Sequence, residues 1–266
     1  MITSLRLLVS GFFLVGLAYA TVKEQLLAVL KDKNALLGIS IFAMLGLVLN
    51  QTAYLQAIYH TNAGTATVLQ YLCPILVLAY TCLKDRQVPT GTEIISILLA
   101  IVGTFLIATH GQLNELSITP IGLFWGIFSA FTYALYIILP GKLIRLYGSM
   151  VVIGLGMLMG GIVVTLGVQT WKQSLPLDTG TTFGLLGIVG VGTIFAYTAF
   201  LKGVSLVGPV NGSLLASIEP IASVFFAVWL VNEQFYTIDF VGMLLILLAV
   251  LLISLKDLMI SRKSIG

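Results

Sequence analysis

The stretch NGSLLASIEPIASVFFAVWL, residues 211–230, decides the fold class of this chain. Its nearly continuous apolar and small residues form a helix long enough to cross a hydrocarbon layer of ~30 Å. An acid and a helix breaker, Glu219 and Pro220, stand in its middle. A carboxylate at that depth costs about 3 kcal/mol on insertion scales, and proline removes a helix hydrogen bond that lipid cannot replace. The stretch therefore predicts a membrane-spanning helix whose Glu219 side faces protein or a wet cavity.

The composition of the whole chain indicates a polytopic membrane protein. Its 266 residues are 59% hydrophobic and 9% charged, and the mean hydropathy is +1.09. Soluble domains carry about 25% charged residues. We therefore predict an all-α polytopic membrane protein with about nine transmembrane helices, at residues 4–20, 35–59, 63–83, 93–109, 120–140, 149–170, 181–201, 211–230 and 238–255.

Lysine and arginine predict the orientation of these spans. The connections on one side hold only Arg6 and Lys172. The alternate connections and the C-terminal tail hold Lys23, Lys31, Lys33, Lys84, Arg86, Lys142, Arg145, Lys202, Lys256, Arg262 and Lys263. By the positive-inside rule the richer set is cytoplasmic. We therefore expect a multi-pass protein of the cytoplasmic membrane, with the C-terminus inside and the N-terminus of this chain outside.

An internal repeat relates the two halves of the chain. Residues 50–83 align without a gap to residues 196–229, each number raised by 146, and Pro74 then coincides with Pro220. The charge pattern gives the two aligned spans opposite directions, which predicts an inverted-topology repeat of the kind found in secondary transporters. The alternative is two unrelated helices that share a mid-span proline. Both prolines are expected to kink their helices.

Polar and aromatic side chains recur on single helix faces in several spans. In the span 120–140 they follow helical spacing, at Trp125, Ser129, Thr132, Tyr133 and Tyr136. Polar groups at membrane depth face the protein interior or a water path. We therefore expect a cavity for a small organic solute, lined by Asn50, Gln51, Tyr54, Gln70, Tyr71, Trp125, Tyr133, Tyr136 and Tyr197. The alternative for any single hydroxyl is a helix–helix hydrogen bond worth about 0.6 kcal/mol.

Glu219 is the candidate proton-coupling residue. A buried carboxylate holds its proton to higher pH, so a membrane-embedded acid could load and release a proton near neutral pH. Proton entry is worth about 2.3 kcal/mol per 100 mV, which could drive solute export. The alternative is a neutral acid, or a structural hydrogen bond that stabilises the kink before Pro220.

Other motifs are few. The chain contains no Walker loop, H-E-x-x-H, C-x-x-C or G-x-S-x-G, so ATP-driven pumps and proteases of those classes are unsupported. We expect no enzyme activity, no cofactor, no metal and no nucleic-acid partner; the expected partners are a small-molecule solute and the lipid bilayer. Gly156 and Gly160 permit close helix contact, which we interpret as intramolecular packing, with a homodimer as the alternative.

The run from residue 197 to residue 255 resembles the second repeat of EamA-type transporters in the drug/metabolite transporter superfamily. The resemblance rests on Ala199-Phe200-Leu201-Lys202, Ser213-Leu214-Leu215, Glu219-Pro220, Glu233 and Gly242. More loosely, Arg6, Pro74 and Asp85 resemble the first repeat. The resemblance implies ten helices in two inverted five-helix repeats, both termini cytoplasmic, and export or exchange of small metabolites.

The chain departs from that family pattern at its start. Its first half is one helix short, which agrees with the charge pattern that places Met1 outside. We therefore expect an incomplete first repeat at 1–110 with about four helices and a second repeat at 118–258 with about five. The expected function is secondary transport or export of amino acid-like or drug-like metabolites. The alternative is a non-transporting membrane sensor or assembly protein that retains the fold.

Overall fold

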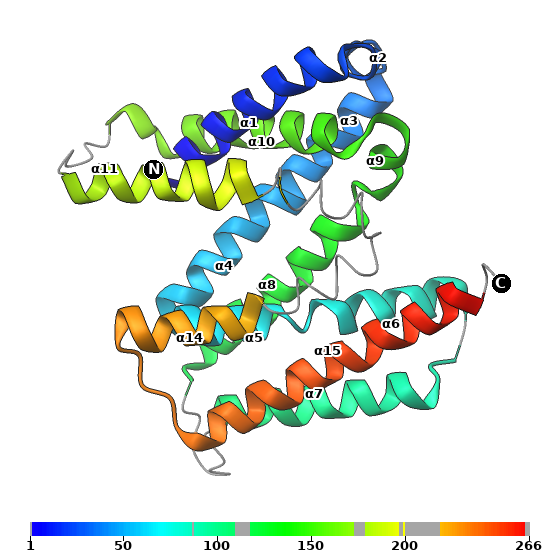
Figure 1. Cartoon of the computed structure of the whole chain (residues 1–266), viewed down its shortest axis with the longest axis vertical. Helices are drawn as coiled ribbons and strands as arrows, with labels where there is room; N and C mark the ends of the chain where they lie inside the picture. Colours follow the sequence, from blue (N-terminus) through cyan, green and yellow to red (C-terminus); the bar gives the residue numbers. More distant parts are fainter. Residues whose placement is uncertain are drawn as a thin grey trace. The chain divides into compact units, whose positions relative to one another are not determined.

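A computed structural model of the chain describes residues 2–86, 88–109, 118–172, 179–196, 199 and 219–263. Helices dominate these ranges, which contain no strand (Figure 1). In chain order the elements are α1 (Ile2–Thr21), α2 (Lys23–Lys31), α3 (Lys33–Ile41), the π-helical η1 (Phe42–Val48), α4 (Leu49–His60), α5 (Ala63–Gln70), α6 (Cys73–Asp85), α7 (Gly91–Thr109), α8 (Pro120–Ile138), α9 (Gly141–Tyr147), α10 (Ser149–Val168), the 3-10 turn η2 (Thr170–Lys172), α11 (Thr179–Leu186), the π-helical η3 (Gly187–Phe195), α14 (Glu219–Val231) and α15 (Thr237–Lys263).

The apolar helices fall on the predicted spans. Among the described residues, four stretches are long and apolar enough to cross a membrane: Thr3–Thr21, Lys33–His60, Pro120–Tyr147 and Ser149–Val168. Shorter apolar helices occupy Ala63–Val77, Gly91–Ile107, Thr182–Phe195 and Thr237–Leu252. Of the predicted span 211–230, the structure describes the part from Glu219 onward.

The predicted span 63–83 consists of two helices rather than one kinked helix. Helix α5 ends at Gln70, a turn follows at Tyr71 and Leu72, and α6 begins at Cys73. Pro74 therefore lies in the first turn of α6, where its missing N–H breaks no helix hydrogen bond. Pro220 likewise is the second residue of α14.

The chain folds into two compact units, each of which draws on both halves of the sequence. The first unit comprises residues 1–51 and 135–206, and the second comprises 52–134 and 207–266. Their boundaries therefore differ from those of the predicted repeats.

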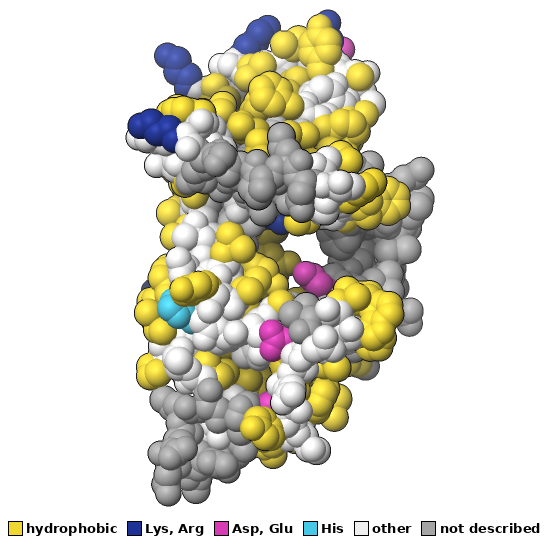
Figure 2. Space-filling view, turned by 90° about the vertical axis from the view of Figure 1, so that its left-hand side faces the viewer, with side chains coloured by type: hydrophobic (Ala, Val, Ile, Leu, Met, Phe, Trp, Pro, Cys, Tyr) yellow, Lys and Arg dark blue, Asp and Glu magenta, His cyan; other side chains and the backbone are white. Residues whose placement is uncertain are grey.

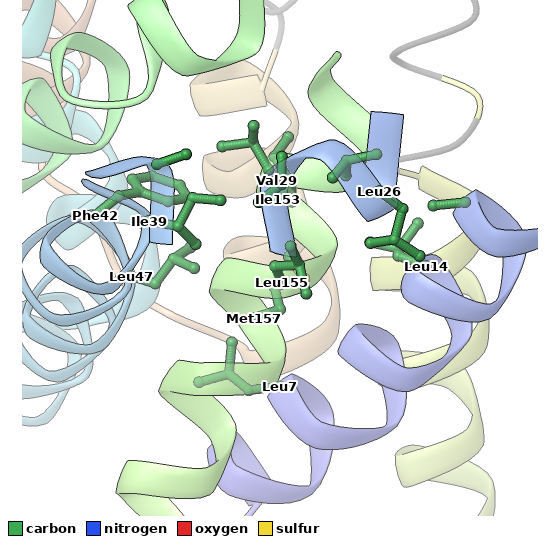
Figure 3. Close-up of a cluster of buried hydrophobic side chains, with 14 residues drawn as sticks. Leu7, Leu14, Leu26, Val29, Ile39, Phe42, Leu47, Ile153, Leu155 and Met157 are labelled. Atoms are coloured by element: carbon green, nitrogen blue, oxygen red, sulfur yellow. The ribbon is translucent and has the colours of Figure 1, made fainter. Parts of the chain in front are cut away.

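In the first unit, α1 packs antiparallel to α10 over a core of aliphatic side chains (Figure 3). A Cβ on Gly154 would lie 3.2 Å from the backbone nitrogen of Val15, and one on Gly161 would lie 2.8 Å from that of Leu8. Leu8 corresponds to Gly154 and Val15 to Gly161, because the numbers in each pair differ by 146. The two close approaches therefore involve the same two equivalent positions, with the helices exchanged. The core contains Leu7, Leu14, Leu26, Val29, Ile39, Phe42, Leu47, Ile153, Leu155 and Met157.

Other elements recur at the same offset. Residue 91 at the start of α7 corresponds to residue 237 at the start of α15, and η1 corresponds to η3. In the second unit α7 and α15 pack together and run in opposite directions (Figure 1). Both pairs of helices that correspond at this offset, α1 with α10 and α7 with α15, are thus antiparallel.

Helices α7 and α15 cross at two glycines. A Cβ on Gly103 would lie 2.6 Å from the carbonyl oxygen of Gly242, and a Cβ on Gly242 would lie 2.7 Å from that of Gly103. Small residues at such a crossing let two backbones approach closely, which is how membrane helices gain packing energy. The core beside it consists of Val68, Ile107, Ile118, Met243 and Ile246.

Equivalent acids cap the two crossing helices of the second unit. Glu93, in the first turn of α7, accepts from the backbone N–H of Thr90. Asp239, in the first turn of α15, accepts from the backbone N–H of Tyr236 at 2.9 Å. Both acids are buried. A carboxylate here satisfies a free N–H and lies at the positive end of the helix dipole.

Removal of either capping acid is expected to destabilise the protein. We expect Glu93→Ala and Asp239→Ala each to lower the free energy of unfolding by about 1 kcal/mol, because each leaves a backbone donor unpaired. Denaturant titration of the purified protein measures this. Glu24→Ala is the matched control, since Glu24 is an exposed acid in the first turn of α2, and its change should stay within about 0.5 kcal/mol. Equal losses in all three variants would contradict a capping role.

Two lysine- and arginine-bearing connections lie together in the first unit. Helix α2 contacts α9, and the Tyr147 hydroxyl donates to Asp32 Oδ2 at 2.8 Å. Asp32 Oδ1 accepts from the N–H groups of Asn34 and Ala35 and caps α3. Most Lys and Arg side chains visible in Figure 2 gather at the end that carries α2 and α9. The charge pattern assigns these connections to one side of the membrane, and in the structure they are in contact.

The Asp32 cap predicts a pH-dependent contribution to stability. The hydrogen bond from Tyr147, and then those from Ala35 and Asn34, hold the pKa of Asp32 below its ordinary value of 3.8. A lowered folded-state pKa contributes stability above pH 3.8 that is lost as the pH falls through the folded value. Tyr147→Phe should therefore lower the unfolding temperature at pH 7, and the difference from the original protein should narrow as the pH falls below 3.8. Unfolding scans between pH 7 and pH 3 measure this; a constant difference would count against it.

Candidate functional site: a polar seam in the second unit

Five polar side chains line one helix contact in the second unit, and we call them the polar seam: Tyr54, Thr67, Tyr71, Glu219 and Ser223. They come from α4, from α5 and the residue that follows it, and from α14. Helices α5 and α14 pack against each other, so the seam lies along their contact.

Hydrogen bonds join all five members in two groups. The Tyr71 hydroxyl donates to Glu219 Oε2 at 2.8 Å. The Thr67 hydroxyl donates to the Ala63 carbonyl oxygen at 2.7 Å. Its proton is therefore engaged, and it accepts from the Tyr54 hydroxyl at 2.6 Å and from the Ser223 hydroxyl at 3.0 Å.

Helical spacing explains why these residues meet. Thr67 and Tyr71 are four residues apart, as are Glu219 and Ser223, so each pair lies on one face. The contacts Tyr71–Glu219 and Thr67–Ser223 then form two successive rungs between antiparallel segments. The Asn62 side chain caps α5 by accepting from the Thr65 N–H at 2.8 Å.

The first rung links the end of α5 to the first described turn of α14. Tyr71 follows the last residue of α5, and Glu219 is the first residue of α14. Tyr71 is buried, with 7% of its surface exposed, whereas the Glu219 side chain is exposed. A carboxylate in the first turn of a helix is favoured by the helix dipole. The arrangement can therefore hold a charged or protonated acid at the edge of a buried hydrogen-bonded surface.

Tyr133 of α8 belongs to the surroundings of the seam. It lies close enough to Tyr71 to interact with it electrostatically. Its neighbours Ser129 and Thr132 instead donate to carbonyls of their own helix, those of Gly126 and Ser129, at 2.7 and 2.9 Å.

The structure brings together only part of the predicted cavity lining. Tyr54, Tyr71 and Glu219 meet in the seam, with Tyr133 beside them, and Gln70 adjoins Tyr71 as the last residue of α5. Trp125 is half-buried against Phe124 and Phe128. Of the remaining predicted residues, Asn50, Gln51 and Tyr136 belong to the first unit, where Tyr136 packs on Phe42, and Tyr197 lies outside the described residues. One cavity shared by all nine stays a prediction.

Two seam residues were missing from the predicted lining. Thr67 and Ser223 lie four residues from Tyr71 and Glu219 respectively, and that spacing is the signal that could have found them. No group of three or more His, Cys, Asp or Glu side chains that could hold a metal occurs among the residues the structure describes.

Comparison with protein families gives the chain its family. The model described as the EamA-like transporter family matches residues 1–109 and 120–255. The chain belongs to the EamA-like transporter family. As an EamA-like transporter it is a multi-pass membrane protein, which confirms the predicted all-α polytopic fold class.

Known proteins agree with the family. This EamA-like chain is 36% identical over 256 residues to the uncharacterized inner membrane transporter YicL of Salmonella typhimurium (strain LT2), covering 96% of this chain and 85% of that protein. It is 22% identical over 191 residues to the uncharacterized transporter YcbK of Bacillus subtilis (strain 168), covering 69% and 61%. A crystal structure superposes with a TM-score of 0.62 at 16% identity, over 96% of this chain and 87% of that one. At that identity the likeness shows the fold alone.

Proposed function

We propose that this EamA-like protein is a secondary transporter that exchanges protons for a small organic metabolite, amino acid-like or drug-like, across the cytoplasmic membrane. Glu219 is the proton-coupling group in this proposal. The observation that carries it is the hydrogen bond from Tyr71 to Glu219, which links the carboxylate to the buried residue that follows α5. The alternative is a sensor or assembly protein that keeps the fold without transport.

The seam supports a link between protonation and helix packing. An ionised Glu219 accepts the Tyr71 hydroxyl proton in a charge-assisted hydrogen bond, which is stronger than a neutral one. A proton bound at the carboxylate weakens that bond and loosens the first rung between α14 and the end of α5. The second rung, Thr67 with Ser223, has no ionisable member and stays unchanged. Protonation of Glu219 thus favours a different packing of α14, which is the differential interaction that a switch requires.

The repeat supports alternating access. We propose two inverted repeats at 1–110 and 118–258, because equivalent helices pack antiparallel in both units and equivalent acids cap α7 and α15. Transporters built this way rock one set of helices against another around a central site. We propose further that the connections bearing α2 and α9 are cytoplasmic, that the C-terminus is inside and that the N-terminus of this chain is outside, on the charge pattern given above.

A flux assay in proteoliposomes tests the proposal. The protein is reconstituted with a panel of labelled amino acids and aromatic amines, and uptake is followed with and without an imposed pH gradient. We expect at least one solute to cross faster than in protein-free vesicles, and faster still with the gradient. Saturable solute binding without flux under any gradient would instead favour the sensor alternative.

A further inference from the structure

Among the residues that the structure describes, a cation on α1 has a buried nitrogen without a hydrogen-bond partner. The Nε of Arg6 is buried and forms no hydrogen bond within the part of the chain that the structure describes. One helical turn further on, Ser10 is completely buried, at 0% exposure, and its hydroxyl also has no hydrogen-bond partner there. Residues four apart lie on one helix face. Arg6 and Ser10 therefore present adjacent, unused hydrogen-bonding groups.

The two residues lie toward one end of the α1–α10 pair. The hydroxyls of Ser4 and Thr170 are 2.9 Å apart and join the start of α1 to the turn after α10. Side chains on a helix lean toward its N-terminus, so Arg6 extends toward that same end. The neighbouring Trp171 is 61% exposed, as an aromatic residue at a membrane boundary is. The predicted spans 4–20 and 149–170 thus place the guanidinium near one membrane surface.

Neither acid that the structure describes in the first unit can neutralise Arg6, and Asp178 of the same unit lies outside the described residues. The acids described there are Glu24 and Asp32, which lie beyond the opposite end of α1, a helix about 30 Å long by its rise per residue. Asp32 is already bonded to Tyr147 and to the start of α3. Guanidinium keeps its charge at every physiological pH, and a desolvated charge without a partner is strongly unfavourable.

We infer that Arg6 and Ser10 form a binding site for an oxyanion, either the phosphate of an anionic lipid or the carboxylate or phosphate of a soluble solute. The planar guanidinium donates through Nε and one Nη to two oxygens of such a group, and the Ser10 hydroxyl donates to the same group. The site belongs to the first unit and does not depend on Glu219 or on the proposed proton coupling.

Three variants of the full-length protein test the site. Arg6→Gln removes the charge, Ser10→Ala removes the hydroxyl at nearly constant volume, and Lys172→Gln is the matched control, because Lys172 is an exposed cation in η2 at the same end. Each is purified into phosphatidylcholine nanodiscs. Thermal unfolding is then followed with phosphatidylglycerol added to the discs, or with sodium phosphate or sodium succinate in the buffer at matched ionic strength.

The proposal expects an anion-dependent shift that requires Arg6. At about a hundredfold excess over the dissociation constant, the unfolding temperature of the original protein and of Lys172→Gln should rise by about 5 °C. The shift should be absent in Arg6→Gln and smaller in Ser10→Ala. A response to phosphatidylglycerol alone identifies a lipid, whereas a response to phosphate or succinate identifies a solute.

Three outcomes overturn the inference. The first is that no anion stabilises the original protein. The second is that Arg6→Gln responds as strongly as Lys172→Gln, which would make the shift a general charge effect. The third is that Arg6→Gln fails to fold in neutral nanodiscs while the original protein folds there, because Arg6 would then act in the fold without any anion. Ser10→Ala tests the role of Ser10 separately. If the anion raises the unfolding temperature of this variant as much as that of the original protein, Ser10 is not part of the site.

Discussion

Replacing Glu219 with glutamine is expected to abolish proton-driven accumulation of solute. Glutamine keeps the side-chain length and a carbonyl oxygen that can accept from Tyr71, so the first rung of the polar seam can still form. The variant cannot bind and release a proton. One proton moving through 100 mV supplies about 2.3 kcal/mol, which sustains a solute gradient of about fifty-fold. In Glu219→Gln the accumulation ratio should fall to about one at every pH, while downhill exchange continues.

Two further variants distinguish a loss of proton coupling from structural damage in that experiment. Glu233→Gln makes the same chemical change at an acid outside the seam, in the connection after α14, and should leave accumulation unchanged. Tyr71→Phe keeps the acid but removes the hydrogen bond that protonation weakens, and should therefore reduce both the rate of transport and its pH dependence. Proteoliposome flux measured from pH 5.5 to pH 8.5 gives all three results. If Glu219→Gln retained the pH dependence of the original protein, Glu219 would not be the coupling group.

Replacing Gly103 with valine is expected to be the most destabilising single change in the second unit. The new Cβ would lie 2.6 Å from the Gly242 carbonyl oxygen and 2.8 Å from Ile246 Cγ1. The backbone atom cannot move aside, so α7 and α15 must separate and lose packing along their contact. Overpacking of a close-packed interior costs about 1–3 kcal/mol, and we expect the upper end of that range, about 3 kcal/mol, because the obstacle is backbone.

Its reciprocal and a control make the glycine prediction specific. Gly242→Val should cost a similar amount, because its Cβ would lie 2.7 Å from the Gly103 carbonyl oxygen. Gly16→Val in α1 is the control, since a Cβ there meets no atom within 4 Å. Denaturant titration in detergent measures the free energy of unfolding of each variant. A Gly103→Val protein as stable as Gly16→Val would refute the close crossing.

Hydropathy located the spans well, because apolar length is a property of the sequence alone. The break between α5 and α6 was placed less well. Pro74 was expected to kink one helix, whereas α5 ends at Gln70. The physical reason is that Pro74 has no N–H, so the Gln70 carbonyl cannot receive the helical bond from four residues ahead. The turn at Tyr71 and Leu72 resolves this by starting a new helix.

The candidate site was harder to predict than the spans. Glu219 stood out because an acid at membrane depth is rare, and Tyr71 because it shares a face with other polar groups. Their pairing, and the second rung of Thr67 with Ser223, depends on the register of α5 against α14, which no local pattern encodes. The capping acids Glu93 and Asp239 could have been predicted, because their residue numbers differ by the repeat offset of 146. The alignment of residues 50–83 with residues 196–229 ends before them.

The π-helical segments η1 and η3 fix the rotational setting of the helices that contain them. Within such a segment each N–H bonds five residues back rather than four, so the turn holds one residue more than an α-helical turn would. If α3 continued as a regular helix, residue 50 would face one direction. Because of the wider turn, residue 50 faces a direction about 100° away from it. Deleting a single residue from Phe42–Val48 should restore regular winding and leave Asn50 on the side of the helix that it faces now, because the wider turn holds that one extra residue. The same deletion in a regular α-helical part of the span would instead rotate every later residue by about 100°.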